Sequence, residues 1–249
     1  MKPIVWSCGG GKQSAAIAAL IIQGKLPRPD AIIMADTRRE RSATWRYVAG
    51  VLQPALQAIG LEIQIARASE YATVDLFDKH GKLLIPAYTT QNGEIGKTRA
   101  FCSNEWKLFV VMRYLTAHGI RPCENWIGIS TNEAHRMKDA RVKWMSHVYP
   151  LCDLGISRQQ CIEIAAKHGF PPAPKSTCYM CPNMSNATWR EIRDDDPDDF
   201  QKAIDIEREA RQRDPHIYLH KSGVTLDKAP LGVELPGLFD TCDSGYCHT

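Results

Sequence analysis

The residues best suited to chemistry are a run of glycines near the start of the chain and a set of cysteines. The apolar residues 4–6 lead into Gly9, Gly10 and Gly11, and a helix-forming stretch follows. Glycines let the backbone turn sharply with its N–H groups pointing inward. The first turn of the helix adds unpaired N–H groups and the positive end of the helix dipole. The pattern therefore predicts a site for an anion, typically a nucleotide phosphate, and a tight turn without a ligand is the alternative.

The cysteines suggest a metal site or reactive thiols. Cys178 and Cys181 form a C-x2-C pair between proline-rich segments, a spacing that lets two sulfurs reach one metal ion or two irons of a cluster. Cys102 precedes an expected helix N-terminus, which favours its thiolate, and Cys247 stands beside His248 as a nucleophilic thiolate would. Three roles stay open for the C-x2-C pair: iron–sulfur ligands, structural zinc ligands and a redox pair.

Composition limits the class of protein. The chain has 249 residues, 44% of them hydrophobic, and a formal net charge of +3. No stretch of about 18 apolar residues or signal-like N-terminus is present, so we expect a cytoplasmic protein that neither crosses a membrane nor is exported. The weak charge suits an anionic small ligand or a transient nucleic-acid contact and requires neither. It argues against a whole tRNA as substrate and leaves a smaller or single-stranded target open.

The order of the expected elements predicts an α/β fold with a doubly wound parallel sheet. Strands are expected at residues 31–35, 62–66 and 126–129, alternating with helices at 42–59 and 104–118. A nucleotide-binding core over residues 1–170 would carry a smaller segment, 171–249, with the C-x2-C pair, a helix and the cysteine-bearing tail. The irregular residues 69–100 are expected to form a substrate lid or another moving element.

Polar residues follow two of the expected strands, at the edge where open α/β sheets bind ligands. Asp36 and Thr37 come after the second strand, and Glu133 and Arg136 follow the strand at 126–129. Each of them also has a purely structural interpretation, as a helix cap or a solvated charge. The sequence therefore predicts that these side chains lie at the crevice where such a sheet binds its ligand.

The glycine loop resembles the PP-loop, S-G-G-x-D-S, of the ATP pyrophosphatase and phosphoadenosine phosphosulfate reductase superfamily. Gly10 and Gly11 match its glycine pair, and Ser14 matches its final serine. Gly9 and Gln13 stand where the first serine and the aspartate would be. Ser7, further upstream, is expected to supply the missing hydroxyl. The resemblance implies the adenine nucleotide alpha-hydrolase-like fold.

The resemblance also implies roles for individual residues. Asp36 and Thr37 match a D-T-G-x-E stretch of reductase-type members, and the order of one cysteine followed by C-x2-C is similar to the cluster-binding branches. The implied catalytic residues are Lys12, Asp36, Glu133, Arg136 and Cys247. The implied nucleotide ligands are Ser7, Gly9, Gly10, Gly11, Lys12, Gln13, Ser14, Asp36 and Thr37. The implied metal ligands are Cys102, Cys178, Cys181 and Cys242, with Cys247 or an open iron as the alternative to Cys242.

The activity that the resemblance implies is sulfur chemistry with an adenine nucleotide, Mg²⁺ and an iron–sulfur cluster, 4Fe-4S by type. In one version ATP adenylylates a carbonyl oxygen of a sulfur acceptor, either a nucleobase or a small molecule, and sulfur then displaces AMP. In a second, the chain reduces a sulfated nucleotide and releases sulfite through attack by Cys247. A third alternative is a nucleotide-binding protein without turnover that holds structural zinc. A homodimer is compatible with all three.

Overall fold

The computed structural model describes residues 2–72, 74–91 and 93–232. The chain divides into two compact units, one drawn from Met1–Thr73 and Trp106–Ser176 and the other from Val74–Glu105 and Thr177–Thr249. Each unit is built from segments that are far apart in the sequence. Among the helices that the structure describes, none has the length and apolar character to cross a membrane.

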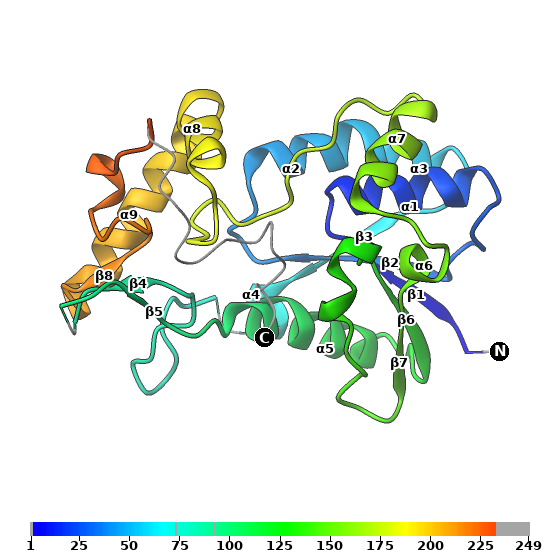
Figure 1. Ribbon diagram of the computed structural model, residues 1–249. Coiled ribbons are helices and arrows are strands. Elements are labelled where there is room, and N and C mark those ends of the chain that lie inside the picture. Colours follow the sequence, from blue (N-terminus) through cyan, green and yellow to red (C-terminus); the bar gives the residue numbers. More distant parts are fainter. Residues whose placement is uncertain (1, 73, 92, 233–249) are drawn as a thin grey trace. The chain divides into compact units, whose positions relative to one another are not determined.

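The first unit is built on a five-stranded parallel sheet with the strand order β3-β2-β1-β6-β7 (Figure 1). The expected α/β parallel sheet is confirmed, and β7 extends it beyond the strands expected from the sequence. Its strands are β1 (Ile4–Ser7), β2 (Ala31–Asp36), β3 (Ile63–Arg67), β6 (Cys123–Ile127) and β7 (Met145–Val148).

Helices cover both faces of this sheet, as a doubly wound fold requires (Figure 1). The helix expected over 42–59 is present as three consecutive helical pieces, the middle one a π-helical turn. One face carries α1 (Lys12–Ile22), α2 (Ser42–Tyr47), the π turn Val48–Leu52, α3 (Gln53–Gln57) and α7 (Arg158–Lys167), and the other carries α4 (Ala68–Tyr71) and α5 (Phe109–Ala117), which a π turn (Asn104–Leu108) precedes. The short 3₁₀ helix Thr131–Arg136 and α6 (Pro150–Asp153) flank β7 in the chain.

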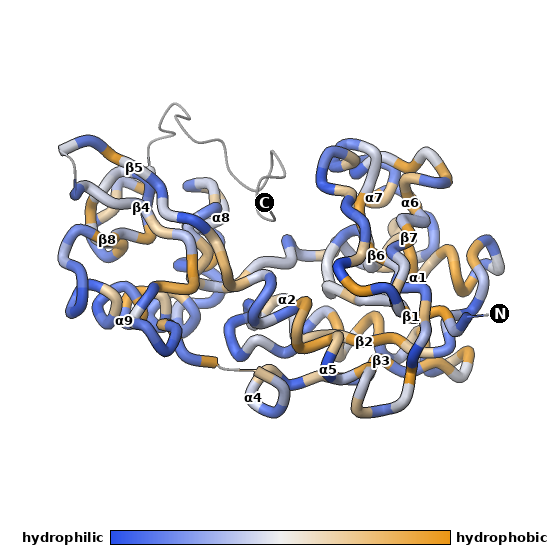
Figure 2. The backbone as a smooth tube through the Cα atoms, turned by 90° about the horizontal axis from the view of Figure 1, so that it is seen from below, coloured by the Kyte–Doolittle hydropathy of each residue, from blue (hydrophilic) through white to orange (hydrophobic). Residues whose placement is uncertain are grey.

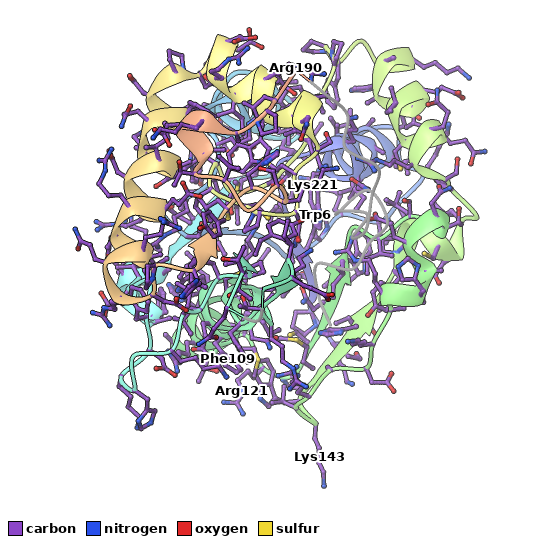
Figure 3. All side chains as sticks on the ribbon, turned by 60° about the vertical axis from the view of Figure 1, so that its left-hand side comes forward. Trp6, Phe109, Arg121, Lys143, Arg190 and Lys221 are labelled. Carbon is purple, nitrogen blue, oxygen red and sulfur yellow. The ribbon has the colours of Figure 1, made fainter. Side chains whose placement is uncertain are left out.

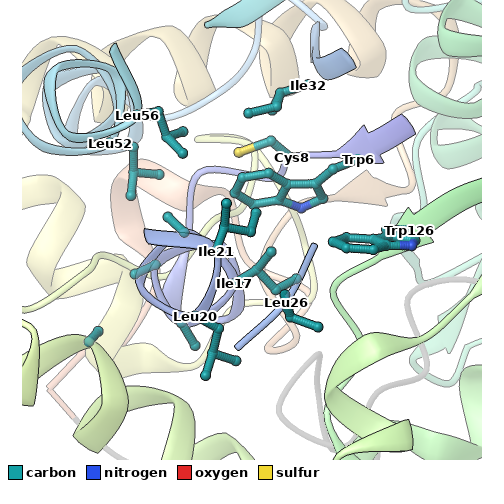
Figure 4. Packing of buried hydrophobic residues seen from close by; sticks show 14 of the residues in the cluster. Trp6, Cys8, Ile17, Leu20, Ile21, Leu26, Ile32, Leu52, Leu56 and Trp126 are labelled. Atoms are coloured by element: carbon teal, nitrogen blue, oxygen red, sulfur yellow. The ribbon is translucent and has the colours of Figure 1, made fainter. Parts of the chain in front are cut away.

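The core of the first unit lies around Trp6 and α1. Trp6 is fully buried, and Ile17, Leu52 and Trp126 belong to the same cluster (Figure 4). Helix α1 is buried from Ser14 to Ile21 because it packs between the sheet and α7. A helix in that position must be apolar on all sides, which explains the strong hydrophobic colour of its sequence in Figure 2. The packing fixes the first turn of α1 against the sheet.

The second unit contains a three-stranded antiparallel sheet and two longer helices. Its sheet has the order β5-β4-β8, so residues 88–89 pair with residues 96–97 on one side and with residues 217–218 on the other. The buried Glu207 carboxylate accepts the backbone N–H groups of Leu219 (2.7 Å) and Leu226 (2.6 Å), which fixes the segment after the last long helix. The elements are β4 (Tyr88–Thr89), β5 (Gly96–Lys97), α8 (Asn186–Asp195), α9 (Pro197–Arg213), β8 (Ile217–Tyr218) and the 3₁₀ turn Leu226–Lys228.

Candidate functional site

The strand order of the first unit reverses between β1 and β6. The chain runs from β1 outward to β2 and β3 on one side, and from β6 to β7 on the other. Open parallel sheets bind ligands at the carboxyl ends of the strands at such a reversal point. The glycine loop follows β1 and the 3₁₀ helix Thr131–Arg136 follows β6. The two segments that the sequence singled out therefore leave the sheet at this point.

Packing alone requires glycine at two positions of the loop. Gly10 has φ +70°, and an added Cβ would lie 2.8 Å from methyl groups of Thr44 and Val48. A Cβ on Gly11 would lie 2.8 Å from the Cβ of Ser176. Gly9 has neither restriction, since its nearest neighbours would be 3.7 Å or more from an added Cβ. Gly10 and Gly11 thus have structural reasons to be glycine whether or not an anion binds.

The start of α1 is electrostatically suited to an anion. Its N-cap is Gly11, which offers no capping side chain, and the first turn contains no acidic residue. The first-turn N–H groups have no partners within the helix, and the dipole places partial positive charge there. Lys12, the first helical residue, adds a full positive charge. The buried Ser14 hydroxyl accepts the Gly9 N–H (3.0 Å) and so closes the loop from inside.

A hydrogen-bonded chain of side chains crosses the reversal point. The Gln13 amide donates to the buried Glu133 carboxylate (2.8 Å), and Arg136 forms an ion pair with the same carboxylate. The buried Nε of Arg136 has no hydrogen-bond partner among the residues that the structure describes. A donor in that state suits an anionic ligand. The network brings Gln13, Glu133 and Arg136 together at the reversal point.

The network explains why glutamine is compatible with position 13. An aspartate or glutamate there would set a second carboxylate against Glu133, whereas the Gln13 amide supplies a donor to it. The departure from the PP-loop pattern is therefore matched by a partner 120 residues away in the sequence.

Asp36 and Thr37 shape the turn that follows β2. The Asp36 carboxylate accepts the Arg38 N–H (2.7 Å), and the Thr37 hydroxyl accepts the Arg39 N–H (3.2 Å). Arg38 adopts φ +60°, a left-handed conformation that is uncommon for a residue with a side chain. These contacts give Asp36 and Thr37 a structural role, and nucleotide contact by either remains a proposal.

Two hydroxyls lie near the start of the loop. Ser7 donates to the Asn125 side chain across β1 and β6 (2.8 Å), so its hydroxyl is engaged within the sheet. Ser176 donates to the Gly9 carbonyl, and its oxygen would lie 3.7 Å from a Cβ on Gly9. Ser176 was not among the expected site residues, because no local pattern marks a serine that reaches the loop from 167 positions away.

A cysteine close to the loop is a poor nucleophile. Cys8 is buried, and its burial raises the pKa of the thiol to about 11 although Gly10 and Ser14 oppose the rise. At neutral pH this side chain is a thiol and not a thiolate. The glycine loop therefore offers charge complementarity to phosphates and no covalent chemistry of its own.

The C-x2-C pair lies in the second unit. The Cys181 N–H donates to the Cys178 carbonyl (3.1 Å), which closes a tight turn of the kind that directs two sulfurs to one partner. Burial raises the pKa of Tyr88 to about 12, and the charge of Cys181 adds to the rise. Burial lowers the pKa of Lys97, and Cys181 opposes this shift. Cys181 is thus close enough to both side chains to interact electrostatically.

The remaining expected metal ligands are less well defined. Cys102 donates its backbone N–H to Leu84 in the second unit (2.8 Å), whereas Cys242 and Cys247 lie outside the described residues. Within residues 2–72, 74–91 and 93–232, no three His, Cys, Asp or Glu side chains form a metal-binding group. The donor chemistry of the Cys178–Cys181 turn fits half of a four-thiolate site, and the full ligand set remains a proposal.

Comparisons with known proteins identify no family. No protein-family model and no curated protein matches the chain. Among solved structures, the chain is similar to the phosphate complex of phosphoadenylyl-sulfate (PAPS) reductase from Candida auris, with a TM-score of 0.43 and 17% sequence identity. The match covers 70% of this chain and 76% of that one. A likeness of this extent carries no conclusion about activity.

Proposed function

We propose that the protein binds an adenine nucleotide at the carboxyl ends of β1 and β6 and uses it for sulfur transfer. The observation that carries the proposal is the start of α1, which has no capping side chain and no acid and is tied through Gln13 to the buried Glu133–Arg136 pair. The choice of adenine rests on the resemblance of the glycine loop to the PP-loop.

The phosphates are the part of the nucleotide that the described residues suit best. In the proposal, the first-turn N–H groups of α1 and Lys12 bind one phosphate group, and Arg136 approaches the same charge from the segment after β6. Glu133 and Gln13 act as positioning residues, because they hold Arg136 at the reversal point. Glu133 holds both Gln13 and Arg136 before the nucleotide arrives, so these side chains need little reorganisation when charge develops on the phosphates.

The proposed reaction is ATP-dependent thiolation. A carbonyl oxygen of the acceptor attacks the α-phosphorus, forms an O–P bond, and breaks the bond to the β-phosphate. Pyrophosphate leaves with that electron pair, and Lys12 and Arg136 neutralise its charge. A hydrosulfide ion then attacks the activated carbon, forms the C–S bond and loses its proton to solvent. AMP departs with the former carbonyl oxygen, and a thiocarbonyl remains.

Two inorganic groups belong to the proposal. Mg²⁺ would be held mainly by the nucleotide phosphates, as is usual for this ion, with Asp36 as the carboxylate at the end of β2. Cys178 and Cys181, with Cys102 and Cys242, are the proposed ligands of an iron–sulfur cluster, which would supply sulfur or electrons when bound. Lys97 would then balance part of the negative charge near Cys181.

Metal analysis tests the cysteine part of the proposal. Protein purified without oxygen should contain about four irons and a matching amount of sulfide per chain, with a broad absorbance near ~400 nm. Cys178→Ala should lose both, whereas Cys152→Ala, at a half-buried cysteine of the first unit, should keep them. A colourless protein with one zinc per chain would show that the cysteines hold a structural metal, and the cluster proposal would fail.

Product analysis tests the reaction itself. The same preparation is incubated with ATP and an unmodified oligonucleotide, and separately with phosphoadenosine phosphosulfate and a dithiol reductant. Pyrophosphate release that requires the oligonucleotide supports thiolation. Sulfite release from the sulfated nucleotide, lost in Cys247→Ser, would identify a reductase and overturn the thiolation proposal.

A further inference from the structure

Residues 135–147 carry a local excess of positive charge that the composition of the chain conceals. They contain four lysines and arginines and one acid, Asp139, a formal net charge of +3 with histidine neutral. The whole chain also has a net charge of +3. The charges of the rest of the chain therefore balance, and the excess corresponds to this one segment.

Three cations of the segment are exposed to solvent. Lys138, Arg141 and Lys143 are exposed, and Arg141 and Lys143 form no ion pair with any residue that the structure describes. Figure 3 shows the Lys143 side chain projecting away from the ribbon. We call Lys138, Arg141 and Lys143 the edge cations, because they lead into β7, the last strand of the sheet.

The backbone of the segment is held in place at Lys138. The Tyr149 hydroxyl accepts the Lys138 N–H (2.8 Å) and donates to the Lys138 carbonyl (2.6 Å). The His147 ring contacts the same carbonyl through Nδ1 (2.8 Å). Both side chains belong to or follow β7, so the segment is fastened to the sheet edge at Lys138. A fixed backbone lowers the ordering cost of binding.

Further cations lie at the amino ends of the neighbouring strands. The Arg121 guanidinium lies 4.4 Å from the ring centre of Trp144, the residue next to Lys143. The Pro3 carbonyl accepts the Glu124 N–H (2.9 Å), which places the exposed Lys2 beside the start of β6. Two acids lie among these cations in the sequence: Glu124, which is half-buried in the sheet, and Asp139, on the segment itself.

The segment that carries the edge cations begins at the candidate site. Arg136 ends the 3₁₀ helix at the reversal point, and the edge cations follow it toward the amino end of β7. The four residues of β7 span ~13 Å, the axial length of about four phosphates on one strand of a duplex. A row of separate cations suits a linear polyanion, whereas a small anion needs only one or two.

We propose that the edge cations, with Arg121 and Lys2, bind the phosphate backbone of a nucleic acid and direct it toward Arg136. The inference rests on the proposed function and identifies a nucleic acid as the bearer of the carbonyl that is thiolated. Backbone phosphates carry no sequence information, so this surface supplies affinity and orientation while the site selects the base.

Fluorescence anisotropy with a labelled single-stranded oligonucleotide tests the inference without turnover. The surface variant is Lys138→Gln, Arg141→Gln and Lys143→Gln combined. The control variant replaces Lys25, Lys79 and Lys167 with Gln, three exposed lysines elsewhere that change the net charge by the same amount. The surface variant should bind about tenfold or more weakly, and its slope of log affinity against log salt should be shallower by about 2. The control variant should match the wild type.

The same preparations are titrated with ATP, so that failure of the two proposals can be separated. The nucleic-acid surface would be overturned if wild type and surface variant bound the oligonucleotide equally, or if the control variant lost as much affinity as the surface variant. Normal ATP binding in the same preparations would show that the nucleotide site is unaffected by that failure. A wild type that binds the oligonucleotide through the edge cations but does not bind ATP would instead overturn the proposed function. Circular dichroism of each variant confirms that its fold is retained.

Discussion

Replacement of Gln13 by glutamate tests the network across the reversal point. The change keeps the length of the side chain and replaces the amide, 2.8 Å from the Glu133 carboxylate, with a second carboxylate. An acid in the first turn of a helix normally gains about 0.3–1 kcal/mol from the helix dipole. The lost hydrogen bond to a charged group costs about 1.5–3 kcal/mol. Repulsion between unit charges 4 Å apart is about 4 kcal/mol at an effective dielectric constant of 20.

Repulsion and the lost hydrogen bond therefore outweigh the dipole, even after Arg136 and side-chain relaxation offset part of them. We expect Gln13→Glu to lower the free energy of unfolding by about 2–3 kcal/mol at pH 7.5. This corresponds to a fall in melting temperature of roughly 4–12 °C for a chain of this size. The control is Gln13→Met, which removes the hydrogen bond without adding charge.

The stability penalty of Gln13→Glu should depend on pH in one direction. Repulsion raises the pKa of one carboxyl of the pair in the folded state, so the folded variant binds more protons than the unfolded chain. The penalty should therefore be absent at low pH and should appear as the pH rises through the raised pKa. Thermal melts at several pH values measure both effects. A Gln13→Glu variant as stable as the wild type at pH 7.5, or one whose deficit matches that of Gln13→Met at every pH, would refute the network.

Three further predictions concern the loop, the strained turn and a buried histidine. Gly11→Ala should destabilise the protein by about 1–3 kcal/mol in denaturant unfolding, because its Cβ would lie 2.8 Å from Ser176. Gly9→Ala should be nearly neutral, and equal losses of stability in the two variants would contradict the packing around Gly11. Arg38→Gly should raise the melting temperature slightly, since relief of the left-handed φ of +60° is worth about 1–2 kcal/mol before the entropy of glycine is subtracted; a loss of stability would argue against strain. Burial lowers the pKa of His220 to about 4 and Lys221 contributes, so stability should fall as the pH drops from 6.5 toward 4, and His220→Gln should flatten that dependence in urea titrations at each pH.

Local chemistry in the sequence predicts the frame of the site well. The strand, glycine turn and helix at residues 4–22 are present as expected, because each depends on neighbours within a few positions. Ser157 and Gln160 form a capping box at the start of α7 with both reciprocal hydrogen bonds in place, and this too depends on residues only three positions apart. The position of Glu133 and Arg136 opposite the loop follows from the parallel order of the strands.

Contacts between distant segments could not be predicted in the same way. Strand β7, Met-Ser-His-Val, is short and only partly apolar, so it has no alternating or apolar signature, yet it pairs in parallel with β6. Ser176 reaches Gly9, and β8 pairs with β4, through folding that no local pattern specifies. Net charge is similarly uninformative, since a value of +3 for the chain hides the concentration of cations leading into β7.

Above all, we infer that nucleotide phosphates bind at the start of α1. Isothermal titration of the wild type with ATP and Mg²⁺, set beside adenosine and the Lys12→Ala variant, measures it most directly. Lys25→Ala, at an exposed lysine just beyond the other end of α1, is the control. We predict that ATP binds, that adenosine binds far more weakly, and that Lys12→Ala alone lowers ATP affinity by about tenfold, as the loss of one charge-assisted contact implies. Equal affinity of the wild type and Lys12→Ala for ATP, or equal binding of ATP and adenosine, would contradict the claim.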